Sequence, residues 1–496
     1  MVASQLVRVT TPPPSEDDIC RRLPVHCFSI EPRLPLLFNL PDGPSPCWES
    51  LDVFEAINTE VSAQVHTFFN APFGVCDSTD CCHRAIHTRR LTIENRDTLP
   101  LLNHVAQLRF FSQASAIGHG VRPFSPRVPL DLATRPPSLR WLECPWLWER
   151  LPIAFESKAP RIFFRIWAGP WRDYRAEFAR GVRDTIPLLP YSLTKARLWF
   201  WMPRDWGDHM DQAMQMPDLV GAPDDFEHMD QAMRQLTLSS TTIEFEGKDP
   251  VSLGLRSLGS LLEELDIRAL ITPDLFPCGS SQTNLWSKMR HLKVEFYPCA
   301  PDGRWYFCGP RGEDPYPTGF NITEEEHYPP AQEHYKELHE LLWDEMEEND
   351  TGDVLEDVHC TDTFRILPIA DRINPLLLTF ALSIQLDKMP LLQDAELFTW
   401  LRWYPSEARA KEYEGSDDAP SSNGDGSMVR WGVKYDGPRE GGDRKGTLTW
   451  QVGRNWKPSP EVIEAFRELV DWDGVNMEWK DLEFVEERGV NFCDYI

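Results

Sequence analysis

The sequence has no long hydrophobic run and no dense set of cysteines. Its longest apolar stretch, residues 373–384, is far shorter than the roughly 20 residues that a membrane span needs. No basic and apolar leader with a small-residue cleavage site is evident. The 12 cysteines are scattered over 496 residues, unlike those of a small secreted domain. These absences predict a soluble intracellular protein, cytoplasmic or nuclear, with no membrane partner and with cysteines that are free thiols packed as small hydrophobes.

Motifs of common enzyme classes are also absent. The glycine-rich stretch 437–446 lacks the Gly-Lys-Ser/Thr ending of a phosphate-binding loop, and there is no G-x-S-x-G turn. His339-Glu340 matches the start of a zinc-protease helix, but Trp343 stands where the second histidine belongs. The sequence therefore nominates no catalytic residue and no cofactor, and we expect a protein that is not an enzyme.

One group of residues could hold a metal. Five thiol and imidazole ligands lie within twelve residues: Cys76, Cys81, Cys82, His83 and His87. Four such ligands satisfy tetrahedral zinc, yet their spacing matches no standard zinc finger. A surface loop with incidental thiols is the favoured interpretation. A metal-dependent enzyme that uses this cluster is kept as an alternative.

A short hydrophobic phrase recurs through the middle of the chain: apolar, two variable residues, apolar, one variable residue, apolar. This is the strand pattern of a leucine-rich repeat, in which alternate side chains enter a shared core. The phrase occurs at Val105/Leu108/Phe110, Leu139/Leu142/Cys144, Leu193/Ala196/Leu198, Leu262/Leu265/Ile267, Met289/Leu292/Val294 and Leu392/Ala395/Leu397. The gaps between phrases are irregular. The pattern predicts an α/β protein, an irregular leucine-rich-repeat-like curved solenoid with large loop insertions.

The chain divides into four parts on composition and periodicity. Residues 1–90 form a Pro-rich segment followed by an amphipathic helix over 48–69. Residues 91–410 hold the repeats, with insertions at 204–235 and 324–358. A polar stretch at 411–428 predicts a flexible linker loop. Residues 429–496 then predict strands near 431–435 and 447–452 and a capping helix over 458–470, and Pro375 is placed in the first turn of a helix that begins near Phe364.

Charge and tryptophan are unevenly distributed. The net charge is −28, but residues 81–200 carry 19 Lys and Arg against 9 Asp and Glu, whereas residues 321–496 carry 17 against 39. Eight tryptophans lie among the arginines of the stretch 140–206. Core filling explains large side chains in irregular repeats. A nucleic-acid interface is the alternative, which the acidic whole chain disfavours because phosphate backbones repel it.

Several segments resemble filamentous-fungal F-box-type proteins with degenerate leucine-rich repeats. They are residues 101–113 (LLNHVAQLRFFSQ), 138–152 (SLRWLECPWLWERLP), 301–315 (PDGRWYFCGPRGEDP), 364–397 and 431–435. The resemblance implies a substrate receptor that docks on the adaptor of a cullin–RING ubiquitin ligase. This chain departs at the F-box itself, because Leu23-Pro24 is not followed by an acidic residue and a helix of Ile and Leu.

These observations together predict a protein–protein recognition scaffold. Strand alternation places cations beside the phrases on the concave strand face, away from the core. The predicted partner-binding residues are Arg109, Arg140, Arg197, Lys293 and Arg402.

Overall fold

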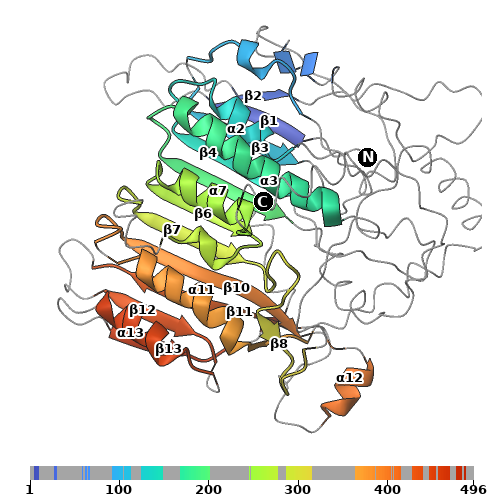
Figure 1. Cartoon of the computed structure of the whole chain (residues 1–496), viewed down its shortest axis with the longest axis vertical. Helices are drawn as coiled ribbons and strands as arrows, with labels where there is room; N and C mark the ends of the chain where they lie inside the picture. The colour runs from blue at the N-terminus through green and yellow to red at the C-terminus, as the bar shows by residue number, and fades with distance from the viewer. Residues whose placement is uncertain are drawn as a thin grey trace, which may run out of the picture.

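The computed structural model places most of its strands in one large sheet. It describes residues 5–10, 27–30, 59, 62–63, 65–66, 92–103, 105–112, 125–148, 168–201, 245, 247–277, 286–314, 364–385, 387–403, 405, 407–414, 427–438, 446–453, 456–469, 476–482 and 485–486. Twelve strands form the sheet in the order β13-β12-β11-β10-β7-β6-β5-β4-β3-β1-β2, with β14 paired to β11. The expected α/β class is confirmed, as a mostly parallel sheet with helices (Figure 1).

The six hydrophobic phrases lie side by side in six neighbouring parallel strands. These strands are β3 (Gln107–Ser112), β4 (Trp141–Trp148), β5 (Lys195–Trp201), β6 (Glu264–Ala269), β7 (His291–Phe296) and β10 (Asp394–Trp403). Their middle apolar residues pair in one continuous row: Leu108, Leu142, Ala196, Leu265, Leu292 and Ala395. None of the apolar residues of the six phrases is more than 7% exposed. The phrases therefore occupy equivalent positions in the sheet.

The turn that leads into each of these strands is also the same. The N–H of the first phrase residue donates to the carbonyl three residues earlier, at 3.0–3.3 Å in all six turns, from Val105→Leu102 to Leu392→Met389. The next carbonyl then accepts two N–H groups from the following strand, as Arg140 O does from Thr194 and Lys195, at 2.7–3.2 Å in each of the five steps. Turn and ladder together fix where each strand starts against its neighbour.

Helices cover one face of this sheet (Figure 1). They are α2 (Val128–Ala133), α3 (Ala168–Thr185), α7 (Pro250–Gly259), α11 (Ala370–Ser383) and α13 (Pro460–Glu468). Short 3-10 turns, η4 (Ile186–Leu188) and η5 (Pro273–Leu275), complete this layer, and η3 (Arg96–Thr98) precedes β3. Their apolar side chains pack with the phrase residues into one continuous core.

The helix α11 corrects one sequence expectation. It begins at Ala370, so Pro375 is its sixth residue and lies inside the helix rather than in the first turn. Proline removes one backbone donor there. One turn later the Thr379 hydroxyl donates to the carbonyls of Pro375 and Leu376 at 3.0 Å.

The C-terminal part continues the same sheet. Strand β11 (Ser427–Asp436) runs antiparallel to β10, followed by β12 (Thr447–Gln451), β13 (Asn476–Lys480) and β14 (Val485–Glu486). Helix α12 (Glu407–Glu412) and β11 extend into both ends of the expected linker 411–428. The strands predicted near 431–435 and 447–452 and the closing helix are confirmed. The pair β8 (Phe307–Cys308) and β9 (Leu367–Pro368) forms a separate small sheet.

The N-terminal part contributes strands that the sequence pattern did not predict. Strand β1 (Gln5–Thr10) runs antiparallel to β3, and β2 (Cys27–Ile30) pairs with β1. Within the expected helix 48–69, the described residues between 59 and 66 are helical. Ser62 joins this segment to the chain before β3, since its hydroxyl accepts from the N–H of Glu94 at 2.9 Å. The insertions at 204–235 and 324–358 lie outside the described residues.

A buried ion pair joins the two helices behind β5 and β6. Both Arg175 of α3 and Asp249 are only 4% exposed, and Arg175 Nη2 donates to both carboxylate oxygens of Asp249 at 2.7 Å and to the carbonyl of Leu270 at 2.9 Å. Asp249 also caps α7 by accepting from the N–H of Ser252 at 2.8 Å. The helices approach closely at Gly254, where an added Cβ would lie 3.1 Å from Phe178.

We predict that Arg175→Ala lowers the free energy of unfolding by about 3–5 kcal/mol, because it leaves the Asp249 carboxylate buried without its cation. The matched control is Arg183→Ala on the same helix, whose side chain is 63% exposed and whose loss should cost within about 0.5 kcal/mol. Urea unfolding followed by far-UV circular dichroism measures both. Equal midpoints for the two variants would contradict the prediction.

Candidate functional site: the charged face of the sheet

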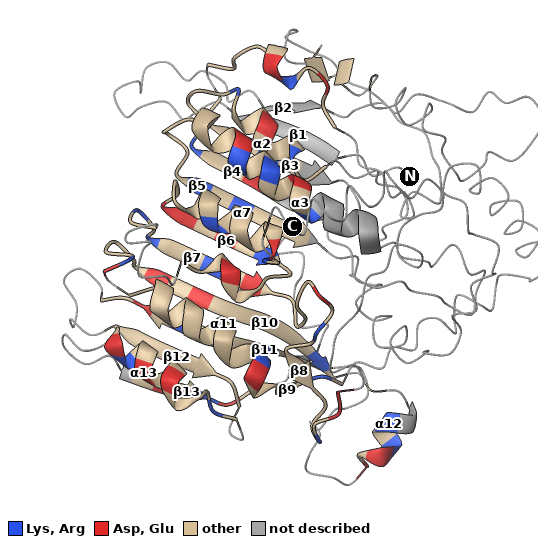
Figure 2. Ribbon diagram, viewed as in Figure 1, with Lys and Arg blue, Asp and Glu red and all other residues tan. Residues whose placement is uncertain are grey.

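The side of the sheet away from the helices carries charged and aromatic side chains. Along β6 and β7 buried residues alternate with partly exposed ones, as expected when one face packs on a core. We call this second side the charged face, and Figure 2 shows Lys, Arg, Asp and Glu spread across the strands. Its members on β3–β7, β10 and β11 include Arg109, Glu143, Lys195, Arg197, Trp199, Glu264, Asp266, Arg268, His291, Lys293, Glu295, Asp394, Glu396, Phe398, Arg430 and Lys434.

One row of the charged face alternates in sign across seven strands. The residues after the middle phrase position pair in register from β3 to β11: Arg109, Glu143, Arg197, Asp266, Lys293, Glu396 and Lys434. Opposite charges on directly paired residues attract, whereas like charges repel. A shift of one strand by one residue would move these charges into the core. The row therefore favours the observed register.

Glu143 is the one buried residue of this row. Its side chain is 2% exposed and lies 3.0 Å from both Arg109 Nε and Arg197 Nη1. Arg197 reaches the other way as well, with its Nε donating to Asp266 at 3.2 Å. Two guanidinium groups compensate for the desolvation of one nearly buried carboxylate. The chain of four residues joins strands β3 to β6 through side chains as well as backbone.

An aromatic residue lies within this network on β5. Trp199 is 4% exposed and lies between two guanidinium groups, with Arg268 4.7 Å and Arg197 5.1 Å from its ring centroid. Its indole N–H donates to Asp266 at 3.0 Å. Such cation–π contacts gain strength when they are desolvated. Arg268 is itself held by Glu295, with Nη2 donating to Oε2 at 2.9 Å, and burial raises the pKa of Glu295 although Arg268 opposes that shift.

A second aromatic residue repeats the arrangement on β10. Phe398 is 2% exposed, with Lys293 5.7 Å and Arg430 3.9 Å from its ring centroid. Arg430 also forms an ion pair with Glu396. Gly432 lies opposite Phe398 on β11, where an added Cβ would lie 2.7 Å from its Cα. Aromatic rings flanked by cations thus occur at two places on the charged face.

The five residues predicted to bind a partner lie in different surroundings. Arg109 and Arg197 are 28% and 35% exposed and form ion pairs with Glu143, while Lys293 lies over Phe398. Arg402 is partly exposed near the end of β10. Arg140 is exposed and precedes β4, in the turn rather than on the strand. The structure brings Arg109 and Arg197 together through Glu143 and places Arg140 at the turn end of the sheet.

Sequence reasoning missed the acidic and aromatic members of the face. Glu143, Asp266 and Glu396 occupy the same phrase position as Arg109, Arg197 and Lys293. Stacking the phrases in order would have revealed the alternating signs. Trp199 and Phe398 also share one position, two residues further along. No single segment carries that signal.

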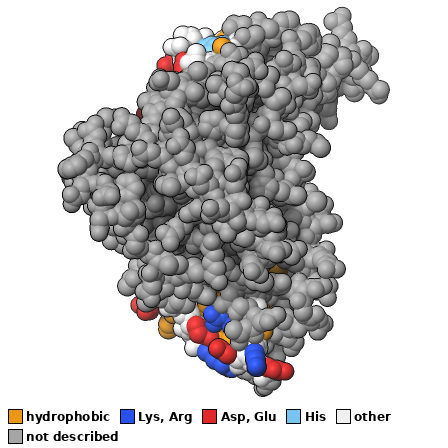
Figure 3. All heavy atoms as spheres, turned by 90° about the vertical axis from the view of Figure 1, so that its right-hand side faces the viewer, with side chains coloured by type: hydrophobic (Ala, Val, Ile, Leu, Met, Phe, Trp, Pro, Cys, Tyr) orange, Lys and Arg blue, Asp and Glu red, His pale blue; other side chains and the backbone are white. Residues whose placement is uncertain are grey.

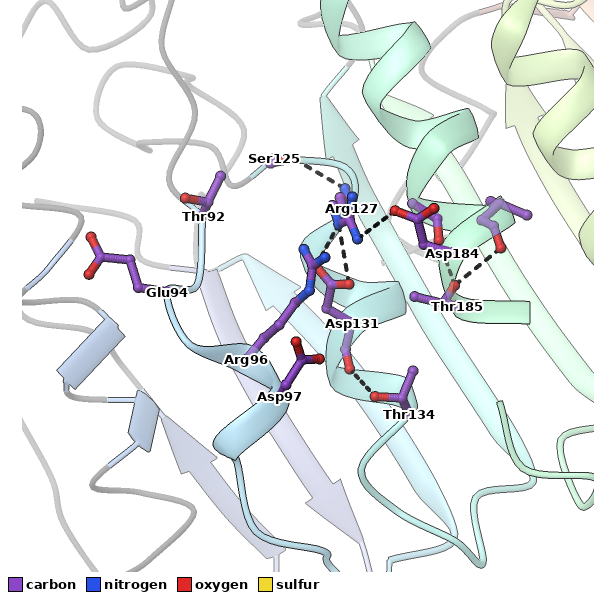
Figure 4. A network of polar contacts seen from close by, with 12 residues as sticks. Thr92, Glu94, Arg96, Asp97, Ser125, Arg127, Asp131, Thr134, Asp184 and Thr185 are labelled. Atoms are coloured by element: carbon purple, nitrogen blue, oxygen red, sulfur yellow. Dashed lines mark hydrogen bonds and ion pairs between the residues drawn. The ribbon is translucent and has the colours of Figure 1, made fainter. Parts of the chain in front are cut away.

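Described arginines of the stretch 81–200 form ion pairs with acids that lie near them in the fold. Figure 4 shows Asp131 of α2 between Arg96 and Arg127, at 3.1 and 3.0 Å, and Arg127 reaching Asp184 of α3 at 3.0 Å. Burial raises the pKa of Asp131 despite both arginines. Where both partners are described, the ion pairs of this stretch use acids between residues 97 and 266.

A smaller cluster holds α12 at the lower end of the molecule. Tyr413 donates to Glu313, and Arg311 lies 4.2 Å from the Tyr413 ring centroid. The Arg409 guanidinium lies 3.5 Å from the ring centroid of Phe364. Burial and the Glu313 carboxylate raise the pKa of Tyr413 to about 12. Figure 3 shows described side chains of both signs together at the level where Figure 1 places α12.

The metal cluster Cys76, Cys81, Cys82, His83 and His87 lies outside the described residues. Elsewhere, the described part of the chain contains no group of three or more His, Cys, Asp or Glu arranged to hold a metal ion. Cys144, Cys299 and Cys308 are buried, as expected for thiols packed as small hydrophobes. Among the described helices, none is both long and apolar enough to cross a bilayer.

Comparisons with known proteins add no relative. No protein-family model matches the chain, and no curated protein or solved structure is significantly similar to it.

We predict that Glu143→Gln lowers the free energy of unfolding by about 2 kcal/mol, because Arg109 and Arg197 lose the carboxylate that they share. Glu264→Gln is the control, since that carboxylate is 38% exposed beside Lys195 and should contribute within about 0.5 kcal/mol. Urea titrations at neutral pH give both values. If Glu264→Gln lowers the free energy of unfolding as much as Glu143→Gln does, the proposed contribution of the Glu143 ion pairs to stability is contradicted.

We predict that the free energy of unfolding depends on pH through the titration of Glu295. Burial raises the pKa of Glu295 in the folded protein above its usual 4.5, so between the unfolded and the folded pKa the folded state binds more protons than the unfolded state. The free energy of unfolding therefore falls as pH rises through that window. Glu295→Gln removes this titration, and its stability should fall less steeply over the same pH range. Urea midpoints measured from about pH 4.5 upward test the difference, and parallel curves for the two proteins would rule it out.

Proposed function

We propose that the protein is a recognition scaffold for another protein, built on an irregular, curved, leucine-rich-repeat-like solenoid. The observation that carries the proposal is that six strands share one register, one core row and one hydrogen-bonded turn. Stacked copies of one supersecondary unit build extended surfaces, which proteins use for binding rather than for enclosing a reaction. The insertions at 204–235 and 324–358 lie between phrases in the sequence, so they interrupt neither the shared strand nor the shared turn.

The chemistry of the charged face favours a protein partner. Its partly exposed side chains mix cations such as Arg109 and Arg197 with carboxylates such as Asp266, and arginine is enriched at binding hot spots. A nucleic-acid partner has less support, because the arginines near Trp199 already pair with Glu143, Asp266 and Glu295. The net charge of −28 also opposes phosphate backbones. A partner that exchanges its own charges for these pairs gains specificity more than affinity.

We further propose that the scaffold serves as a substrate receptor of a cullin–RING ubiquitin ligase in the cytoplasm or nucleus. The support is the resemblance of residues 90–496 to F-box-type proteins with degenerate repeats. Because residues 1–90 contain no evident F-box, contact with the ligase adaptor would use a diverged module in that part. The proposal includes no enzymatic step within this chain.

Affinity purification of the full tagged chain from its native cells, with quantitative mass spectrometry, tests these proposals. We expect at least one stoichiometric protein partner, and a cullin–RING component if the receptor role is correct. The variant Lys293→Ser/Arg402→Ser on the charged face should reduce partner recovery about fivefold or more. The control Lys288→Ser, in the turn before β7, should leave it unchanged.

The ligase role and the scaffold function are contradicted by different outcomes of this experiment. Partners without any cullin–RING component would remove the ligase role and leave the scaffold. Recovery of nucleic acid that is lost steeply with added salt, in place of a protein, would contradict the scaffold itself.

A further inference from the structure

Three of the five large apolar side chains that are exposed in the described chain lie in neighbouring turns at one end of the parallel strands. The other two lie apart from them, Leu391 in the turn before β10 and Trp479 on β13. Leu101 precedes β3 and is 60% exposed, and Leu188 and Tyr191 precede β5 and are 56% and 104% exposed. Pro137, before β4, is exposed as well. These residues are in the turns that lead into the first three phrases. Large apolar side chains that cluster on a surface mark interaction sites more often than scattered ones do.

The three turns are joined to one another, so these residues form one surface. Leu102 N donates to the carbonyl of Arg135 at 3.2 Å, and Ser192 Oγ donates to the carbonyls of Pro137 and Leu139 at 3.2 and 2.7 Å. Since β3 and β5 are two strands apart, the outer turns are separated by about 10 Å. We call Leu101, Pro137, Arg140, Leu188 and Tyr191 the turn-end patch.

A single cation lies in the middle of this patch. Arg140 is exposed, and its backbone bonds to Ala106 on one side and to Thr194 and Lys195 on the other. Among the described residues its side chain forms no ion pair. The nearby charges are otherwise compensated: Asp97 by Arg135, Asp184 by Arg127 and Arg183, and Lys195 by Glu264. Arg140 is thus the uncompensated charge of the patch.

We propose that the turn-end patch binds a short peptide segment of a protein partner in which one carboxylate is flanked by apolar side chains. The carboxylate would pair with Arg140, whose planar guanidinium suits bidentate contact with a carboxylate. The apolar side chains would cover Leu101, Leu188 and Tyr191. This inference rests on the proposed scaffold function and names the surface and the chemistry of its partner.

The test uses the full chain and three fluorescein-labelled peptides of the same length. They share flanking Leu and Phe residues and carry Asp, Asn or Lys at the centre. In fluorescence anisotropy titrations at low salt, the Asp peptide should bind about tenfold more tightly than the Asn peptide, and the Lys peptide should bind most weakly. Added salt should reduce this preference.

Two variants separate the contributions of the patch. Leu188→Ser/Tyr191→Ser should weaken binding of the Asp and Asn peptides alike, by about tenfold. Arg140→Ala should abolish the preference for Asp over Asn and leave the binding of the Asn peptide nearly unchanged. The control is Leu391→Ser, another exposed leucine in the turn before β10 (44% exposed), which should behave as wild type. Because all these side chains are exposed, folding should be retained, and far-UV circular dichroism checks it.

The proposal is overturned if no peptide binds below about 1 mM, if the Lys peptide binds as well as the Asp peptide, or if Leu391→Ser weakens binding as much as the patch variant. Its failure differs from failure of the scaffold function. If cellular partners remain bound to Leu188→Ser/Tyr191→Ser, recognition stands and the turn-end patch is not its site. If wild-type chain recovers no protein partner, the scaffold function fails whatever the peptides do.

Discussion

The backbone ladder between the six phrase strands is the constraint on which the rest of the structure depends. Each phrase begins with the same turn, and in the first five phrases the carbonyl after the first residue accepts two N–H groups from the next strand. With the strand start fixed in this way, the period of two assigns every side chain to a face. Leu142 and Leu265 enter the core, while Glu143 and Asp266 face the other way. A core on one side and a charged face on the other are consequences of one alignment.

The charged face in turn restricts that alignment. A slip of one strand by one residue would turn all of its side chains to the other face of the sheet. Side chains therefore reinforce the register that turn and ladder set, in which Glu143 lies beside both Arg109 and Arg197. The near burial of Glu143 makes an unpaired alternative costly. Charge pairing on this face therefore stabilises the sheet. A partner could bind these charges only by replacing the ion pairs that they already form.

Much of the sheet could be predicted from the sequence, because a strand pattern is local. The six phrases and strands β11 and β12 were all visible as alternating apolar residues. Contacts between distant segments were not visible, because no local pattern relates Arg175 to Asp249 or strand β1 to β3. The start of α11 at Ala370 was missed for the same reason. Phe364 and Ile366 pack against Trp403 and Tyr413, so their apolar side chains belong to a tertiary cluster and not to the helix, which begins at Ala370.

The positions of the predicted partner-binding cations could be inferred in part from the sequence. The side chains with which those cations pair could not. Strand parity correctly placed Arg109, Arg197 and Lys293 away from the core, but their charges are engaged by Glu143, Asp266 and Phe398. Exposure and charge together single out a different location, where Arg140 lies among apolar turn residues. A cation whose neighbours already satisfy it must lose those contacts when it binds, whereas an uncompensated cation loses only water. On this ground the turn end of the sheet is the better place for a partner's carboxylate than the middle of the charged face.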